Sequence, residues 1–153
     1  MSKKTAGILL FRRNNSLTEF LLVHPGGPFW AKKELGAWSV PKGEFQDPEE
    51  PLEAAKREFL EETGTAVDGN FIPLTPVRLK SGKTFYAFAL EHDLDATKIN
   101  SNTFPMEWPP HSGKIREFPE VDKGEWMNAE TAFKLINPGQ VALLKELVQM
   151  LEK

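Results

Sequence analysis

The sequence predicts an α/β fold in which a mixed sheet is covered by helices on both faces. Two observations carry this prediction: short segments with strand composition recur along the chain, and three segments have helical periodicity. Such a mixture favours a layered domain with one hydrophobic core. A chain of 153 residues, of which 40% are hydrophobic, is expected to form a single domain over residues 1–153.

The opening of the chain predicts a hairpin. Residues 5–11 (TAGILLF) are an apolar run typical of a buried strand, and residues 19–24 (EFLLVH) are a second one. Between them, residues 13–16 have the composition of a turn. Residues 36–40 (GAWSV) predict a further short strand.

A loop rich in chain breakers follows the hairpin, with Pro25-Gly26-Gly27-Pro28 at its start. It continues into Trp30 and Lys33. An aromatic ring beside a lysine in a loop fits contact with a base and phosphates, and it equally fits ordinary packing of a surface loop. Both interpretations stay open.

Residues 43–65 predict a loop that enters a helix crowded with carboxylates. Residues 47–50 suit a capping box with proline at the first helical position, but Pro51 equally suits the start of a helix one turn later. Gly64 is expected to end the helix, because glycine adopts the left-handed cap conformation without steric cost. The buried stripe is predicted to hold Leu52, Ala55, Phe59 and Thr63.

The second half of the chain starts with a second predicted hairpin. Residues 71–79 contain two prolines and predict an edge strand, and residues 84–90 (TFYAFAL) predict a strand rich in aromatics, across a turn at residues 81–83. Residues 93–119 lack periodicity and predict a long loop, which in a domain of this size is usually functional.

The chain ends with a short strand and two predicted helices. Residues 124–127 read as the strand, and Asn128 suits the cap of a helix over residues 129–135. Asn137-Pro138 opens the last helix, which has an apolar face.

Three glutamates share one face of the helix within residues 43–65. Glu58, Glu61 and Glu62 lie within roughly 100° of one another around the axis. Like charges repel, so a compensating cation is expected, and Mg²⁺ is typically held by a few carboxylates together with substrate phosphates. On spacing alone, a solvated acidic face is the more frequent explanation of such a charge run.

The same stretch resembles the signature of the Nudix hydrolase family, which reads G, five residues, E, seven residues, then R-E-U-x-E-E-x-G-U, where U is bulky and apolar. Phe59 fits the first U, whereas Thr65 departs from the second, a packing position. A match at seven fixed positions arises by chance about once in 10⁸ windows. The fixed letters are matched by Gly43, Glu49, Arg57, Glu58, Glu61, Glu62 and Gly64.

The resemblance implies the Nudix α/β/α sandwich with a mixed central sheet, and it implies a metal site. Glu58 and Glu62 are the expected primary metal ligands, with Glu61 as a further ligand and the Gly43 carbonyl beside them. Mg²⁺ is the expected cofactor, with Mn²⁺ as an alternative. Arg57 is expected to orient the helix carboxylates, with Glu49 as its partner.

The general base varies within the family that the sequence resembles. Glu58 is one candidate, and a glutamate from a distant loop is the other. Glu120, six residues before Trp126, is the best distant candidate and Glu117 is the runner-up. The predicted catalytic group therefore comprises Glu58, Arg57, Glu61 and Glu120.

Substrate contacts are predicted at Lys42, Trp30, Lys33 and Tyr86. Lys42 precedes a helix N-terminus, where phosphate binds well. Its Pro-Lys-Gly context resembles the dinucleoside polyphosphate and diphosphoinositol branches of the family, and the opening TAGILLFRR and the Trp126 segment resemble the diadenosine tetraphosphate hydrolase-like branch. The aromatic rings are candidates for stacking on a base, although packing is the commoner role of each ring alone.

Composition excludes several functional classes. The chain has no cysteine, so disulfides, thiolate catalysis and thiolate zinc sites are absent. The net charge of −3 argues against long nucleic acid as a partner. Without an apolar segment of membrane-spanning length, no membrane partner is expected and the location is predicted to be cytoplasmic. A homodimer is a candidate assembly, because dimers are common in the resembled family.

The function expected from these observations is a Mg²⁺-dependent pyrophosphohydrolase that cleaves a diphosphate linkage in a nucleotide derivative. A dinucleoside polyphosphate is the leading substrate class. The alternatives are nucleoside triphosphates, ADP-ribose or nucleotide sugars, and RNA 5′ ends. A non-catalytic nucleotide-binding module is the second alternative, against which the full set of glutamates argues.

Overall fold

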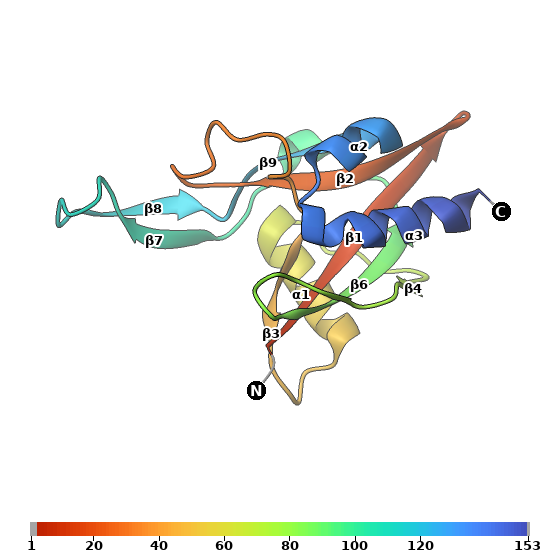
Figure 1. Cartoon of the computed structure of the whole chain (residues 1–153), viewed down its shortest axis with the longest axis horizontal. Helices are drawn as coiled ribbons and strands as arrows, with labels where there is room; N and C mark the ends of the chain where they lie inside the picture. The colour runs from red at the N-terminus through yellow and green to blue at the C-terminus, as the bar shows by residue number, and fades with distance from the viewer. Residues whose placement is uncertain (1–2, 153) are drawn as a thin grey trace.

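A seven-stranded mixed sheet forms the centre of the molecule in the computed structural model, which describes residues 3–152 (Figure 1). Its main path runs in the order β4-β6-β1-β2-β9, and β3 and β5 are attached to β1 and β6. Helix α1 (Pro51–Thr63) lies on one face and helices α2 (Ala129–Leu135) and α3 (Val141–Leu151) lie on the other. The strands are β1 (Lys4–Asn14), β2 (Leu17–Pro25), β3 (Lys42–Phe45), β4 (Ile72–Pro73), β5 (Val77–Arg78), β6 (Thr84–Glu91) and β9 (Val121–Asn128).

The sheet is mixed because its central pair, β1 and β6, runs parallel while the other pairs are antiparallel. Alternation along β1 divides the core between the two faces. Ala6, Ile8 and Leu10 pack towards α1, whereas Leu9 and Phe11 pack towards α2 and α3. The predicted α/β fold with helices on both faces is therefore confirmed.

Helix α1 begins at Pro51, so the later of the two predicted starts is correct. The capping box at residues 47–50 is wrong, because its side chains have other partners. Asp47 bonds Lys4, and Glu49 is held by Arg57. Gly64 ends the helix with a φ of 77°, as predicted.

Two predicted strands differ from the structure. Residues 36–40 do not form a regular strand and contribute only isolated bridges, from Trp38 to Ile136 and from Ser39 to Val23. Residues 71–79 lie at the sheet edge as predicted, but they form two separate short strands, β4 and β5, that both pair with β6. Strand β3 was not predicted. Its Gly43 pairs with Ala6, which places the motif glycine beside β1.

The predicted loop over residues 93–119 is wrong in its main part. It contains the short helix η1 (Ala96–Lys98) and a hairpin formed by β7 (Thr103–Glu107) and β8 (Ile115–Pro119). These two strands pair only with each other within the described part of the chain. Figure 1 shows that the hairpin projects from one end of the molecule.

The last part of the chain follows the prediction closely. The Asn128 side chain accepts a hydrogen bond from the Thr131 N–H and so caps α2. Asn137 caps the short helix η2 (Pro138–Gln140), which leads directly into α3. Within residues 3–152, no helix has the length and hydropathy that crossing a membrane requires.

Candidate active site

Helix α1 and strand β3 bring the glutamates of the motif together. A Cβ on Gly43 would collide with the carboxylate of Glu58, so a larger residue at this position would displace that carboxylate from the start of β3. One turn further along the helix, Oε1 of Glu62 accepts a hydrogen bond of 3.1 Å from the backbone N–H of Lys42. The two predicted primary ligands therefore both face the start of β3.

Arg57 connects the entering loop to the glutamates of α1. Its Nε and Nη2 each donate to one oxygen of Glu49 at 2.9 Å, which forms a bidentate pair. Its Nη1 donates to Glu58 at 3.0 Å and to Glu61 at 2.8 Å. Arg57 thus contacts carboxylates on both sides and holds them at fixed positions.

Burial and crowding make the charged forms of two glutamates costly. Desolvation, together with neighbouring Glu61, raises the pKa of Glu58 to about 7. Desolvation raises the pKa of Glu62 to about 8, although the Lys42 N–H and charge lower it. The site therefore has more carboxylate groups than its protein cations neutralise.

The donor set fits a hard divalent cation. Within residues 3–152, no three Asp, Glu or His side chains converge closely enough to hold a metal ion as they stand, and Nη1 of Arg57 donates to both Glu58 and Glu61. The other two donors of the same guanidinium, Nε and Nη2, bind the Glu49 carboxylate instead. Carboxylate and carbonyl oxygens at Gly43, Glu58, Glu61 and Glu62 are the ligands that Mg²⁺ and Mn²⁺ take.

Glu120 lies next to this cluster, whereas Glu117 has a different partner. The Glu120 N–H donates to the carbonyl of Asn102, and the Asn102 N–H donates to the carbonyl of Glu61, at 2.8 Å each. Burial and the charge of Glu61 raise the pKa of Glu120. The Glu117 carboxylate accepts instead from the Thr103 hydroxyl. Of the two distant candidates, the structure brings Glu120 to the glutamate cluster.

A cavity of about 320 Å³ adjoins the cluster through Lys42. The Lys42 side chain lines this cavity, and burial lowers its pKa. Sequence reasoning missed most of the lining, because β5, the β5–β6 turn and η2 meet there only in the folded chain. The other lining residues are Leu79, Lys80, Ser81, Asn137, Pro138, Gly139 and Gln140.

The remaining predicted substrate residues do not line this cavity. Trp30 is 40% exposed, and the Lys33 ammonium lies 5.2 Å from the centre of its ring. Tyr86 packs edge-to-face on Phe45 in the core cluster beneath α1. Lys42 is therefore the one member of the predicted set that contacts both the glutamate cluster and the cavity.

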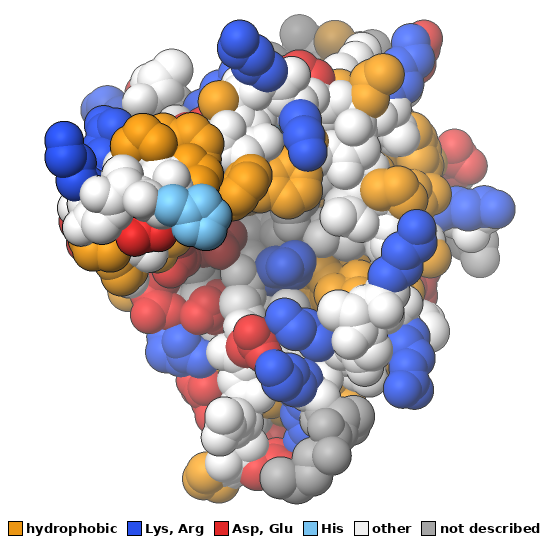
Figure 2. All heavy atoms as spheres, turned by 60° about the vertical axis from the view of Figure 1, so that its left-hand side comes forward, with side chains coloured by type: hydrophobic (Ala, Val, Ile, Leu, Met, Phe, Trp, Pro, Cys, Tyr) orange, Lys and Arg blue, Asp and Glu red, His pale blue; other side chains and the backbone are white. Residues whose placement is uncertain are grey.

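The surface shows the same arrangement. In Figure 2, a hollow below the forward-facing end of the molecule has acidic side chains along one wall and basic side chains opposite them. Opposed charges of this kind suit a ligand whose phosphates are bound partly by lysine or arginine and partly through a cation.

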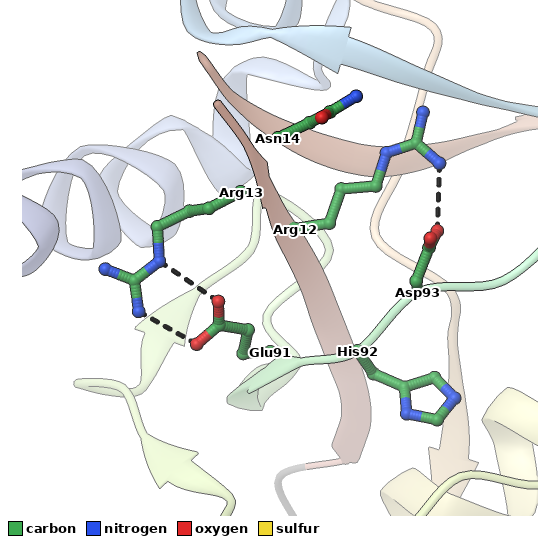
Figure 3. A pocket seen from close by; sticks show the side chains of 6 residues that line it. All are labelled: Arg12, Arg13, Asn14, Glu91, His92 and Asp93. Atoms are coloured by element: carbon green, nitrogen blue, oxygen red, sulfur yellow. Dashed lines mark hydrogen bonds and ion pairs between the residues drawn. The ribbon is translucent and has the colours of Figure 1, made fainter. Parts of the chain in front are cut away.

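A second hollow, of about 390 Å³, lies at the other end of β1 (Figure 3). Arg13 forms a fork with Glu91, and Arg12 pairs with Asp93 and Glu19. Because both guanidiniums already have carboxylate partners, this hollow is a weaker candidate for binding an anion.

Comparison with known proteins yields a family model and curated relatives. The family model described as NUDIX domain matches residues 1–147. An RNA pyrophosphohydrolase of Agrobacterium fabrum is 30% identical over 128 residues, which are 72% of this chain and 69% of the relative. An octanoyltransferase of Myxococcus xanthus is 33% identical over 99 residues, or 65% of this chain. The match spans only 25% of that protein's length.

Solved structures share the fold at low sequence identity. An Ap4A hydrolase binary complex from C. elegans has a TM-score of 0.63 at 19% identity, with 98% of each chain covered. The NUDIX domain of Shewanella oneidensis NrtR, complexed with ADP ribose, has a TM-score of 0.66 at 15% identity. The match covers 100% of this chain and 90% of the NrtR chain. These likenesses confirm the sandwich fold that the motif implied.

Proposed function

Because the chain belongs to the Nudix family, we propose that it is a Mg²⁺-dependent pyrophosphohydrolase that cleaves a diphosphate linkage in a nucleotide derivative. The observation that carries this proposal is the juxtaposition of the Glu58–Glu61–Glu62 cluster with the cavity lined by Lys42. The glutamate cluster can hold a cation on the phosphates. The cavity offers a lysine and a pocket for the group that is attached to the diphosphate.

Each side chain has a separate task in this proposal. Glu58, Glu61 and Glu62, with the Gly43 carbonyl, would hold the cation, and Arg57 orients Glu58 and Glu61 while gripping Glu49. A bound divalent cation neutralises phosphate oxygens and lowers the pKa of its water. Lys42 would bind a phosphate oxygen on the cavity side, where its ammonium forms no ion pair within residues 3–152.

Glu120 is the proposed general base. Its pKa is raised by partial desolvation and by the charge of Glu61, which makes the carboxylate a better proton acceptor than a glutamate with an ordinary pKa. Backbone hydrogen bonds through Asn102 hold it beside Glu61. From this position it can take the proton of a water that attacks phosphorus, and Glu58 is the alternative acceptor.

A dinucleoside polyphosphate is the leading substrate class, and one of the solved structures that share this fold is an Ap4A hydrolase. RNA 5′ ends are the second candidate, because a relative that is 30% identical carries the name RNA pyrophosphohydrolase. Nucleoside triphosphates, ADP-ribose and nucleotide sugars are the remaining candidate substrates. We place the activity in the cytoplasm, where such nucleotides are made and consumed.

Product analysis with Mg²⁺, with Mn²⁺ and with EDTA tests the proposal. The panel holds diadenosine tetraphosphate, ATP, dGTP, ADP-ribose, a nucleotide sugar and a 5′-triphosphate RNA. We expect metal-dependent release of AMP and ATP from the first substrate, faster than turnover of the others. Hydrolysis that persists at full rate in EDTA would contradict the metal site.

Glu62→Gln separates a hydrolase from a binding module. We expect turnover to fall by roughly 100-fold or more with the fold intact, because loss of even an outer partner of a metal ligand costs 10- to 100-fold. Glu53→Gln, on the exposed first turn of the same helix, is the matched control and should keep the wild-type rate. A wild-type protein that binds nucleotides and hydrolyses none of them would favour the non-catalytic module.

A further inference from the structure

The β7–β8 hairpin has two chemically different faces. The cross-strand pairs Phe104–Phe118 and Met106–Arg116 share one face, because side chains alternate along each strand. The same alternation places Trp108 and Lys114, at the ends of the strands, on that side. The opposite face holds Thr103, Pro105, Glu107, Ile115, Glu117 and Pro119.

Charge is segregated between these faces. Both carboxylates of the strands, Glu107 and Glu117, lie on the second face, whereas Arg116 lies on the first with three half-buried apolar side chains. We refer to this surface, formed by Phe104, Met106, Trp108, Lys114, Arg116 and Phe118, as the ring-and-cation face. Rings with interspersed cations and no carboxylate are the composition that binds bases and phosphates.

The root of the hairpin is fixed to the candidate active site. Asn102, just before β7, donates to the Glu61 carbonyl, and Glu120, just after β8, donates to Asn102. The pair Phe104–Phe118 is therefore two residues from both of these anchors. From there the face extends over four residues to Trp108, or about 14 Å at some 3.4 Å per strand residue.

A loop on the same side supports the hairpin. A Cβ on Gly27 would lie 3.1 Å from the Phe104 ring, and Phe29 meets Trp108 edge-to-face at 6.1 Å. Phe29 itself is 62% exposed. The Phe29 ring and the ring-and-cation face together form one surface that extends from the glutamate cluster to the tip of the hairpin.

We propose that the ring-and-cation face of the β7–β8 hairpin binds the nucleotide unit beyond the cleaved diphosphate, with a base on its rings and a phosphate against Arg116 and Lys114. This inference rests on the proposed function and extends it to substrates that carry a second nucleoside. The unit has two sources with the same chemistry: the distal nucleoside of a dinucleoside polyphosphate, or the nucleotides that follow an RNA 5′ end.

The matched ligands that test this are adenosine tetraphosphate and diadenosine tetraphosphate, which differ in the second nucleoside and in the one ionisable oxygen that its ester bond removes. GTP and a 5′-triphosphate pentanucleotide that begins with G form the RNA pair. Dissociation constants are measured in EDTA, where metal-dependent hydrolysis stops, and KM values are measured with Mg²⁺. The variants are Lys114→Ala/Arg116→Ala and, separately, Trp108→Ala.

We expect each variant to weaken binding of the two-nucleoside member of one pair by about fivefold or more, since a stacked base alone contributes that much. Binding of the single-nucleoside member should stay within about twofold, because its nucleoside and phosphates are held away from the hairpin, at the Lys42 cavity. The pair that responds identifies the source of the second unit.

Lys134→Ala/Lys145→Ala is the charge-matched control, because it removes the same two positive charges from α2 and α3 on the opposite side of the molecule. Equal losses in this control and in Lys114→Ala/Arg116→Ala would mean a long-range charge effect and would overturn the proposal. The proposal would also be overturned if the hairpin variants weakened binding of both members of a pair equally, or if they weakened binding of neither member.

Failure of this inference is distinguishable from failure of the proposed function. A protein that hydrolyses the panel with Mg²⁺ while the hairpin variants bind like wild type retains the function and loses the subsite. A protein that hydrolyses nothing, yet shows the hairpin-dependent difference in EDTA, retains the subsite and loses the function.

Discussion

The backbone N–H of Lys42 donates to Oε1 of Glu62 over 3.1 Å, while the Lys42 side chain lines the adjacent cavity. One residue at the start of β3 thus fixes an expected metal ligand with its backbone and offers a cation to the ligand with its side chain. A shift of β3 relative to α1 would change the contact with Glu62 and the position of the Lys42 side chain together. The glutamate cluster and the cavity are therefore structurally coupled.

The stability of the metal-free protein should fall as the pH rises from about 5 to about 8.5. Burial raises the pKa of Glu62 from 4.5 to about 8 in the folded state, so the folded state holds the proton more tightly than the unfolded one. The resulting stabilisation is complete below the unfolded pKa and is lost as the pH passes the folded pKa. Thermal melts in EDTA across this range measure the effect.

Two comparisons sharpen that measurement. Glu62→Gln should reduce the slope to the part that Glu58 contributes, because glutamine carries no charge to desolvate, whereas Glu53→Gln should leave the slope unchanged. Added Mg²⁺ should raise the melting temperature more at pH 8 than at pH 5.5, since carboxylates bind the cation only when ionised. A melting temperature that does not vary with pH in EDTA would contradict the burial of Glu62.

Glu120→Gln should lower turnover by roughly 10²- to 10⁴-fold, the usual contribution of a general base. Stopped assays with the best substrate of the panel measure it. Glu125→Gln, an exposed glutamate on β9, is the control and should keep the wild-type rate. A loss below about tenfold would move the role to Glu58, and a large loss in Glu117→Gln would assign it to the other distant candidate.

The glutamate cluster was predictable from the sequence because it depends on local spacing. Glu58, Glu61 and Glu62 lie within two turns of one helix, and Gly64 ends that helix whatever the rest of the fold does. The cavity was not predictable beyond Lys42. Ser81 and Gln140 meet there only because β5 and η2 pack side by side, and nothing in their local sequence indicates it.

The hairpin was missed for a different reason. Pro105 and Pro119 read as breakers, and residues 93–119 were predicted as a loop. In a two-stranded sheet each strand is an edge strand, so a proline whose missing N–H faces solvent is tolerated. The alternation of Phe104, Met106 and Trp108 was the local signal that competed with those prolines.

Arg57→Lys should lower turnover by roughly 10- to 100-fold, as the loss of an orienting partner of metal ligands does. A lysine cannot keep the fork on Glu49 while also contacting Glu58 and Glu61. Arg13→Lys is a matched control, because Arg13 forms a similar fork with Glu91 at the far end of β1 (Figure 3). Equal rates in the two variants would show that the Arg57 fork has no role in catalysis.

Lys42→Met should weaken substrate binding without weakening the fold. Burial lowers the pKa of Lys42, so its charge destabilises the free protein, and methionine fills a similar space without that charge. At pH 6, where the Glu62 carboxyl is largely protonated, we expect a melting temperature at or above the wild-type value. KM should rise by about tenfold or more, the usual value of a charged hydrogen bond to phosphate. Lys83→Met, which removes a lysine paired with Glu44 at 3.2 Å, should leave KM nearly unchanged. A lowered melting temperature with unchanged KM for Lys42→Met would make Lys42 a structural residue and separate the cavity from the substrate.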